Sequence, residues 1–128
     1  MGNATPLARV RGLGSAKEGA HHWWHQRVTA GLNVLLVTWF VVSLVRMPGF
    51  AYSDVTRWLS SPWAAVPMVL FVANVFYHFR LGLQVVIEDY QHDASRIAWM
   101  LLLNVFTLGA GALAVFSILK IAFTGTPD

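Results

Sequence analysis

Three long apolar stretches dominate the chain. Residues 28–45, 60–79 and 97–119 contain no Asp, Glu, Lys or Arg. Each stretch is close to or above the roughly 18 apolar residues that mark a candidate membrane-spanning helix. The pattern therefore predicts an all-α membrane protein with three transmembrane helices.

Residues that stop or start helices flank these stretches. Pro48 and Gly49 follow the first stretch, Pro62 is acceptable in a first helical turn, and Asp93 and Ser95 offer capping groups before the last stretch. The amphipathic segment 50–59 is expected to form a short helix in the membrane interface. The glycine-rich residues 1–20 are interpreted as an N-terminal arm, and residues 21–128 as the transmembrane domain. Within that domain the predicted helices are at about 24–46, 61–89 and 96–123.

Composition supports a bilayer environment and narrows the possible chemistry. The chain is 56% hydrophobic and 12% charged, and it has no cysteine, which excludes disulfides, thiolate metal sites and iron–sulfur ligation by this chain. Its net charge of +3 is small and scattered, so no nucleic-acid partner is expected. The basic leader leaves an organellar transit peptide as an alternative interpretation.

Basic residues near the helix ends predict the orientation. The arm and the 89–96 loop carry Arg9, Arg11, Lys17, Arg27 and Arg96, against Arg46, Arg57 and Lys120 at the other side. The excess favours a cytoplasmic N-terminus. We expect a multi-pass protein of the bacterial cytoplasmic membrane, in preference to the mitochondrial inner membrane.

Each predicted helix carries an asparagine in its span, and the third has a run of small residues at 109–112. Both features are typical of helices that pack closely in a membrane, although they are also ordinary helix-packing features. Three helices alone make a thin bundle, so a partner membrane chain is expected.

Polar residues on the second helix indicate a site. At helical spacing Asn74, His78, Gly82, Val85 and Asp89 share one face, which must point into the bundle. There the His78 imidazole is a satisfied core group, a proton relay or an axial ligand of heme iron. Gly82, one turn later, leaves room for a flat macrocycle.

Two further groups have open interpretations. Arg80 either extends its guanidinium to the headgroups or reaches inward to an anion such as a heme propionate. The cluster formed by His21, His22, His25 and Arg27 is either an interfacial belt or part of a pocket at the depth of Asp89 and Tyr90.

The pattern formed by His78, Gly82, Asp89 and Tyr90, together with HHWWHQRVTA before the first helix, resembles the hydrophobic membrane-anchor subunits of succinate dehydrogenase, in their alphaproteobacterial and mitochondrial branch. The resemblance covers the chain from about residue 21 to the end of the third helix. It implies one half of a heme-binding bundle that a cytochrome b subunit completes, attached to an iron–sulfur subunit and a flavoprotein subunit.

The resemblance also implies roles for single residues. His78 corresponds to the axial ligand of a shared heme b, and Gly82 belongs to the same motif. Arg27 and His21 correspond to residues near the heme propionates. Arg80 departs from the aromatic residue of some bacterial members.

The same resemblance implies a ubiquinone-reduction site at the end of the second helix. Tyr90 corresponds to the tyrosine that donates a hydrogen bond to a quinone carbonyl, with Asp89 supporting it. The chain is expected to act as a subunit of an enzyme and to catalyse nothing alone. The alternatives are the anchor of a fumarate-reductase-like quinone oxidoreductase and a non-redox assembly or transport component.

Overall fold

The protein, described by a computed structural model over residues 5–10 and 19–125, is built of helices. The described elements are α1 (Pro6–Val10), α2 (Gly19–Arg46), α3 (Tyr52–Ser60), α4 (Pro62–Tyr90) and α5 (Ser95–Thr124). The remaining residues of the predicted N-terminal arm lie outside the described ranges. Within those ranges there is no β-strand, which confirms the predicted fold class.

Three of these helices, α2, α4 and α5, are long and apolar enough to cross a membrane. They contain 28, 29 and 30 residues, and a helix rises about 1.5 Å per residue against a hydrocarbon thickness of roughly 30 Å. The predicted ends agree closely for α4 and α5. Helix α2 begins at Gly19 rather than near residue 24, because its local hydrogen bonds continue through polar residues.

The short connections between the long helices have the predicted chemistry. Pro62 occupies the first turn of α4, and the Asp93 carboxylate accepts hydrogen bonds from the Ser95 hydroxyl and backbone N–H before α5. These bonds, led by the one from the hydroxyl, hold the pKa of Asp93 below its ordinary value. The amphipathic segment forms α3, as predicted.

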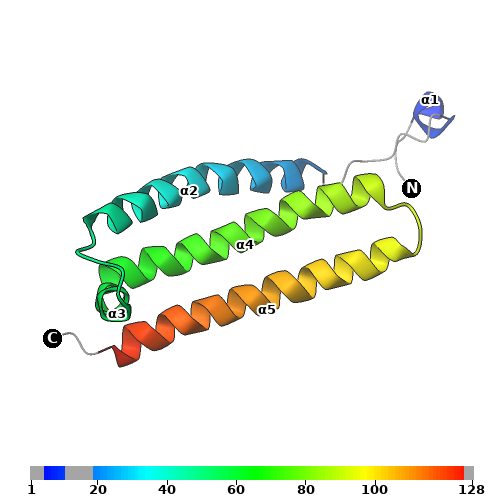
Figure 1. The fold of residues 1–128 in the computed structure, drawn as a ribbon. Helices are drawn as coiled ribbons and strands as arrows, with labels where there is room; N and C mark the ends of the chain where they lie inside the picture. The colour runs from blue at the N-terminus through cyan, green and yellow to red at the C-terminus, as the bar shows by residue number, and fades with distance from the viewer. Residues whose placement is uncertain (1–4, 11–18, 126–128) are drawn as a thin grey trace.

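The long helices form an open layer with α4 in the middle (Figure 1). Helix α4 packs against both α2 and α5, whereas α2 and α5 do not pack against each other within the described residues. The core near α3 contains Leu59, Ala65 and Ile118, and the Trp58 ring of α3 stacks on Trp39 of α2 at 5.9 Å between centroids. Each outer helix therefore meets only one side of α4, and apolar side chains remain exposed along the layer.

Asparagines hold the layer together, as the sequence predicted. The buried Asn74 amide donates to the Thr29 carbonyl oxygen at 2.9 Å and to Asn33 Oδ1 at 2.7 Å. Arg80 Nε donates to Asn104 Oδ1 at 2.6 Å and joins α4 to α5. In the small-residue run, a Cβ on Gly111 would lie 3.4 Å from Phe76 Cγ, so a glycine there permits close approach of α5 to α4.

Candidate functional site

A groove lies between the N-terminal part of α2 and the C-terminal half of α4. Its volume is about 710 Å³, within the roughly 300–1,000 Å³ typical of ligand pockets. His78, Gly82 and Arg27, three residues predicted to surround a heme, line this groove together. The other lining residues are Gly19, His22, Trp23, Gln26, Ala30, Gln84, Val85 and Glu88.

His78 lies on the face of α4 that meets α2. Its Nδ1 is 2.8 Å from the hydroxyl oxygen of Thr29, and no hydrogen bond involves its Nε2 within the described residues. Asn74, one turn earlier, also contacts α2. The predicted polar face therefore points into the protein at Asn74 and His78, whereas its later members Val85 and Asp89 are exposed.

Gly82 borders the same groove one turn beyond His78. A Cβ built at this glycine would meet only Gln26 Nε2, at an ordinary contact distance of 3.5 Å. The glycine therefore presents no side chain to the groove that it lines together with His78. That this glycine makes room for a flat macrocycle stays a prediction.

The α2 side of the groove contains unsatisfied polar atoms. His22 Nε2 and Gln26 Oε1 are buried and have no hydrogen-bond partner in the described part of the chain. Because a buried polar group without a partner costs roughly 1–3 kcal/mol, these atoms favour the presence of a polar ligand or of a neighbouring subunit. His22 lines the groove, whereas His21, the predicted residue, is exposed and outside its lining.

Arg27 supplies positive charge at the groove. Its guanidinium carbon lies 5.0 Å from the centroid of the Trp23 ring, a cation–π geometry that holds the side chain over the aromatic face. Arg27 is exposed and borders the groove, so it places a positive charge there.

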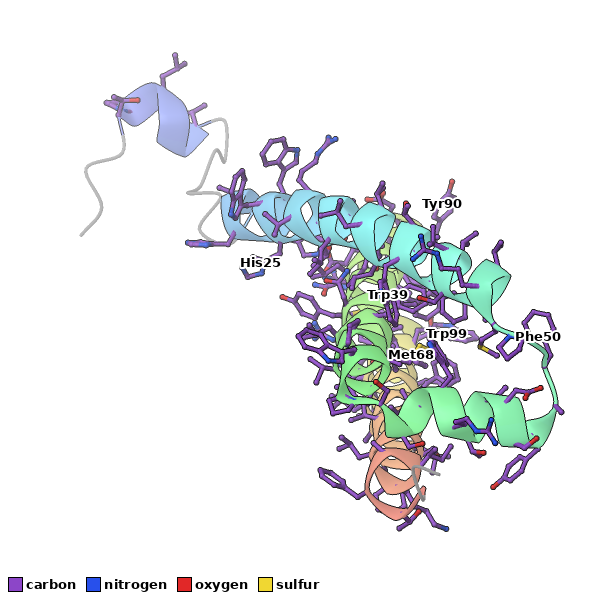
Figure 2. The ribbon with its side chains drawn as sticks, turned by 90° about the vertical axis from the view of Figure 1, so that its left-hand side faces the viewer. His25, Trp39, Phe50, Met68, Tyr90 and Trp99 are labelled. Carbon is purple, nitrogen blue, oxygen red and sulfur yellow. The ribbon has the colours of Figure 1, made fainter. Side chains whose placement is uncertain are left out.

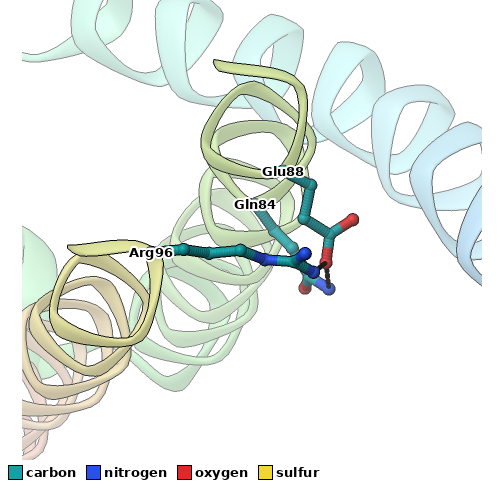
Figure 3. Close-up of polar contacts among 3 residues, drawn as sticks. All are labelled: Gln84, Glu88 and Arg96. Atoms are coloured by element: carbon teal, nitrogen blue, oxygen red, sulfur yellow. Dashed lines mark hydrogen bonds and ion pairs between the residues drawn. The ribbon is translucent and has the colours of Figure 1, made fainter. Parts of the chain in front are cut away.

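The opposite rim of the groove carries a carboxylate. Gln84 Nε2 donates to Glu88 Oε1 at 3.0 Å, and Arg96 Nη2 of α5 lies 3.6 Å from the same oxygen (Figure 3). Because these ionic side chains are about half exposed, the ion pair contributes little to stability. The pair places the negative charge of Glu88 at the end of the groove and neutralises it with the positive charge of Arg96.

Arg80 lies away from this groove. Its guanidinium donates to Asn104 of α5, and its side chain borders a separate hollow between α4 and α5. The structure does not bring Arg80 together with His78, Gly82 and Arg27 in one lining. Its predicted contact with a propionate stays a prediction.

Asp89 and Tyr90 occupy the end of α4. Both side chains are exposed, and Figure 2 shows Tyr90 projecting from the helix surface. Tyr90 is 12 residues beyond His78, or about 18 Å along a helix axis. Neither residue lines the groove of His78.

Another tyrosine lies next to the histidine cluster of α2. Tyr77 Oη is 2.9 Å from His25 Nδ1, whereas Tyr90 was predicted to be the phenol at the depth of that cluster. The two tyrosines therefore differ. Tyr77 has a hydrogen-bond partner on α2, whereas Tyr90 is exposed at the end of α4.

Sequence reasoning missed the polar stripe of α2 that borders α4. The stripe consists of His22, Gln26, Thr29 and Asn33, whose spacing of three and four residues places them on one face of a helix. This spacing could have predicted a polar face on α2. Taken alone it is weak evidence for a site, because Thr and Gln are common in helices without any functional role.

Comparison with known proteins identifies the family. Residues 1–112 match the family model described as succinate dehydrogenase/fumarate reductase transmembrane subunit. No solved structure matches the chain.

Named relatives agree with that family model. The chain is 32% identical to the "Succinate dehydrogenase hydrophobic membrane anchor subunit" of Rickettsia bellii, over 86% of this chain and 91% of the relative. It is 29% identical to the protein of the same name from Paracoccus denitrificans, over 91% and 90% of the two chains. A "Succinate dehydrogenase membrane anchor subunit" of Reclinomonas americana is 30% identical over 72% and 80%. With three apolar helices and a histidine-bearing groove between α2 and α4, the chain belongs to the succinate dehydrogenase/fumarate reductase transmembrane subunit family.

Proposed function

We propose that this chain is the membrane anchor subunit of a succinate dehydrogenase, that it holds a heme b together with a cytochrome b subunit, and that it contributes to a ubiquinone-reduction site. The names of its relatives support the anchor role and association with the catalytic flavoprotein and iron–sulfur subunits. They favour succinate dehydrogenase over the fumarate-reductase alternative. The groove at His78 is the observation that carries the heme part of the proposal.

The residues of the groove fit a heme in three respects. His78 keeps Nε2 free of hydrogen bonds, Gly82 presents no side chain to the groove that it lines with His78, and buried His22 Nε2 and Gln26 Oε1 lack partners in the described ranges. Neutral imidazole is an established axial ligand of heme iron. Those ranges contain no group of three or more His, Asp or Glu side chains for a bare metal ion, so one histidine with space beside it suits a porphyrin better than such an ion.

Each residue then has a chemical task. His78 would hold the iron, and Arg27 would pair with a propionate because a guanidinium binds carboxylates strongly. When bound, heme supplies one-electron chemistry. A partner chain would complete the site that holds the heme, because the other described histidines lie outside the membrane-spanning core of these helices.

The quinone part of the proposal concerns the exposed end of α4. The Tyr90 phenol would donate a hydrogen bond to a quinone carbonyl, and this bond strengthens as negative charge develops on reduction. Asp89, the adjacent carboxylate, would orient the phenol or pass protons from the aqueous side. Both side chains are exposed, so they are accessible to a substrate and a soluble subunit.

The reduced-minus-oxidised visible spectrum of the purified complex tests heme ligation. We expect a b-type heme signal that is lost or strongly altered in His78→Ala, because the iron loses its ligand from this chain. His92→Ala is the matched control, since His92 is exposed in the α4–α5 connection. An unchanged spectrum in His78→Ala would remove His78 as the ligand, and absence of any heme signal in the wild-type complex would refute the heme part.

A further inference from the structure

The hydroxyl of Thr29 contacts the imidazole of His78 across the α2–α4 interface. Thr29 is 7% exposed, and its Oγ1 lies 2.8 Å from His78 Nδ1. This distance is that of a good hydrogen bond. Sequence spacing does not reveal the contact, because the two residues are 49 positions apart.

The direction of this bond follows from counting protons. A threonine hydroxyl has one proton to donate and two lone pairs to accept with. Thr29 Oγ1 lies 2.7 Å from the His25 carbonyl oxygen and 3.2 Å from that of Gln26, and a carbonyl can only accept. The single hydroxyl proton therefore goes to a carbonyl, and the Thr29 oxygen accepts a hydrogen bond from Nδ1–H of His78.

This assignment determines the tautomer of the neutral imidazole. With the proton on Nδ1, the lone pair is on Nε2, the nitrogen without a hydrogen bond in the described structure. The opposite tautomer would protonate Nε2 and remove its capacity to bind a metal. Thr29 thus prepares His78 for ligation through Nε2.

The position of Thr29 is itself held by α4. Asn74, one helical turn before His78, donates to the backbone carbonyl oxygen of Thr29 at 2.9 Å and to Asn33 at 2.7 Å. The backbone of Thr29 and its side chain therefore contact neighbouring turns of the same helix. This double contact limits sliding or rotation of α2 past the imidazole.

We infer that Thr29 is a positioning residue, which sets the tautomer and ring orientation of His78 by accepting the Nδ1 proton. The inference rests on the proposed heme ligation by His78. A hydrogen bond from Nδ1 to an acceptor increases electron density at Nε2 and thereby stabilises the oxidised iron. Loss of this acceptor should raise the midpoint potential of the heme.

The test compares Thr29→Val with Thr29→Ser in the assembled complex. Valine keeps the branched shape without the hydroxyl, whereas serine keeps the hydroxyl. We expect Thr29→Val to raise the heme midpoint potential in a redox titration and to lower the heme-to-protein ratio, since the hydrogen-bond partner of a metal-binding histidine typically contributes about 10–100-fold to metal affinity. Thr29→Ser should return both values toward those of the wild type.

Thr38→Val is the matched control. Thr38 is on the same helix, and among the described residues its hydroxyl donates only to the Val34 carbonyl oxygen of its own helix, so neither value should change. If Thr29→Val does not accumulate, Thr29→Ala carries the same expectation. An unchanged potential without the hydroxyl, or equal shifts in the valine and serine variants, would overturn the role of Thr29. Failure of the proposed heme ligation by His78 would be seen separately, as an unaltered heme spectrum in His78→Ala.

Discussion

Single side chains in the groove differ in how their polar atoms are satisfied. His78 Nδ1 has the Thr29 hydroxyl as its partner, while His22 Nε2 and Gln26 Oε1 are buried without one in the described structure. A buried polar atom without a partner is costly, so a ligand or neighbouring subunit that supplies one stabilises the assembly. At this scale the groove combines unpartnered polar atoms of α2 with the His78 imidazole of α4.

The quinone site is also tested at the residue scale. Tyr90→Phe removes one hydroxyl and little else, because Tyr90 is 78% exposed and forms no hydrogen bond within the described residues. We expect succinate-dependent ubiquinone reduction to fall about 10–100-fold, as for loss of a hydrogen bond to a developing charge of roughly 1.5–3 kcal/mol. Succinate oxidation by an artificial soluble acceptor should remain intact.

Tyr77→Phe is the control for that experiment. Tyr77 is on the same helix, but its hydroxyl contacts His25, so quinone reduction should stay near the wild-type rate. Equal loss of both activities in Tyr90→Phe would contradict a specific role at the quinone.

Pairs of helices are joined by polar contacts as well as by apolar packing. Asn74 links α4 to α2 through two acceptors, and Arg80 links α4 to α5 through Asn104. Interhelical hydrogen bonds in membranes contribute about 0.6 kcal/mol on average and up to roughly 1.7 kcal/mol. These contacts stabilise the layer moderately, and they fix which faces of the helices meet.

Substitution of Asn74 tests this role at the scale of the helix pair. Asn74→Leu leaves the Thr29 carbonyl and Asn33 Oδ1 without their donor, so we expect the free energy of unfolding in detergent to fall by about 1–2 kcal/mol. Asn33→Leu removes only one of the two bonds and should cost less. Thermal or denaturant unfolding of the purified complex measures both changes, and a larger loss in Asn33→Leu would contradict this account.

The whole molecule is an open layer in which α4 is central (Figure 1). A single layer leaves apolar side chains exposed along all three long helices. Lipid or a second membrane subunit must cover these side chains. If heme binds at His78 as proposed, the same openness leaves room for a partner chain to complete its site.

Membrane orientation is a prediction for the whole molecule. The excess of basic residues predicts a cytoplasmic N-terminus, and three spans then put α3 outside and the α4–α5 connection inside. Because the chain has no cysteine, single introduced thiols report their location. Ser53→Cys should react with a membrane-impermeant maleimide in spheroplasts, whereas His92→Cys should react only after permeabilisation; the reverse pattern would contradict the orientation.

The site was predictable to the extent that its signals are local in the sequence. Spacing on α4 placed His78 and Gly82 on an inward face, and resemblance to the family added Arg27; the structure brings all three to one groove. It places His22 there instead of its neighbour His21. Successive residues of a helix are about 100° apart, so this difference depends on the rotation of α2, which a string of residues does not specify.

The sequence by itself determined the three spans, their breaks and the short helix between the first two. Those features follow from the cost of placing charge in hydrocarbon and from backbone hydrogen bonds within each segment, and neither depends on distant residues. Only the tertiary structure decided the order of the helices in the layer, the separation of Arg80 from the groove, and the contact of Thr29 with His78. These depend on how each nearly uniformly apolar helix is rotated and paired, which is set by interhelical bonds such as those of Asn74.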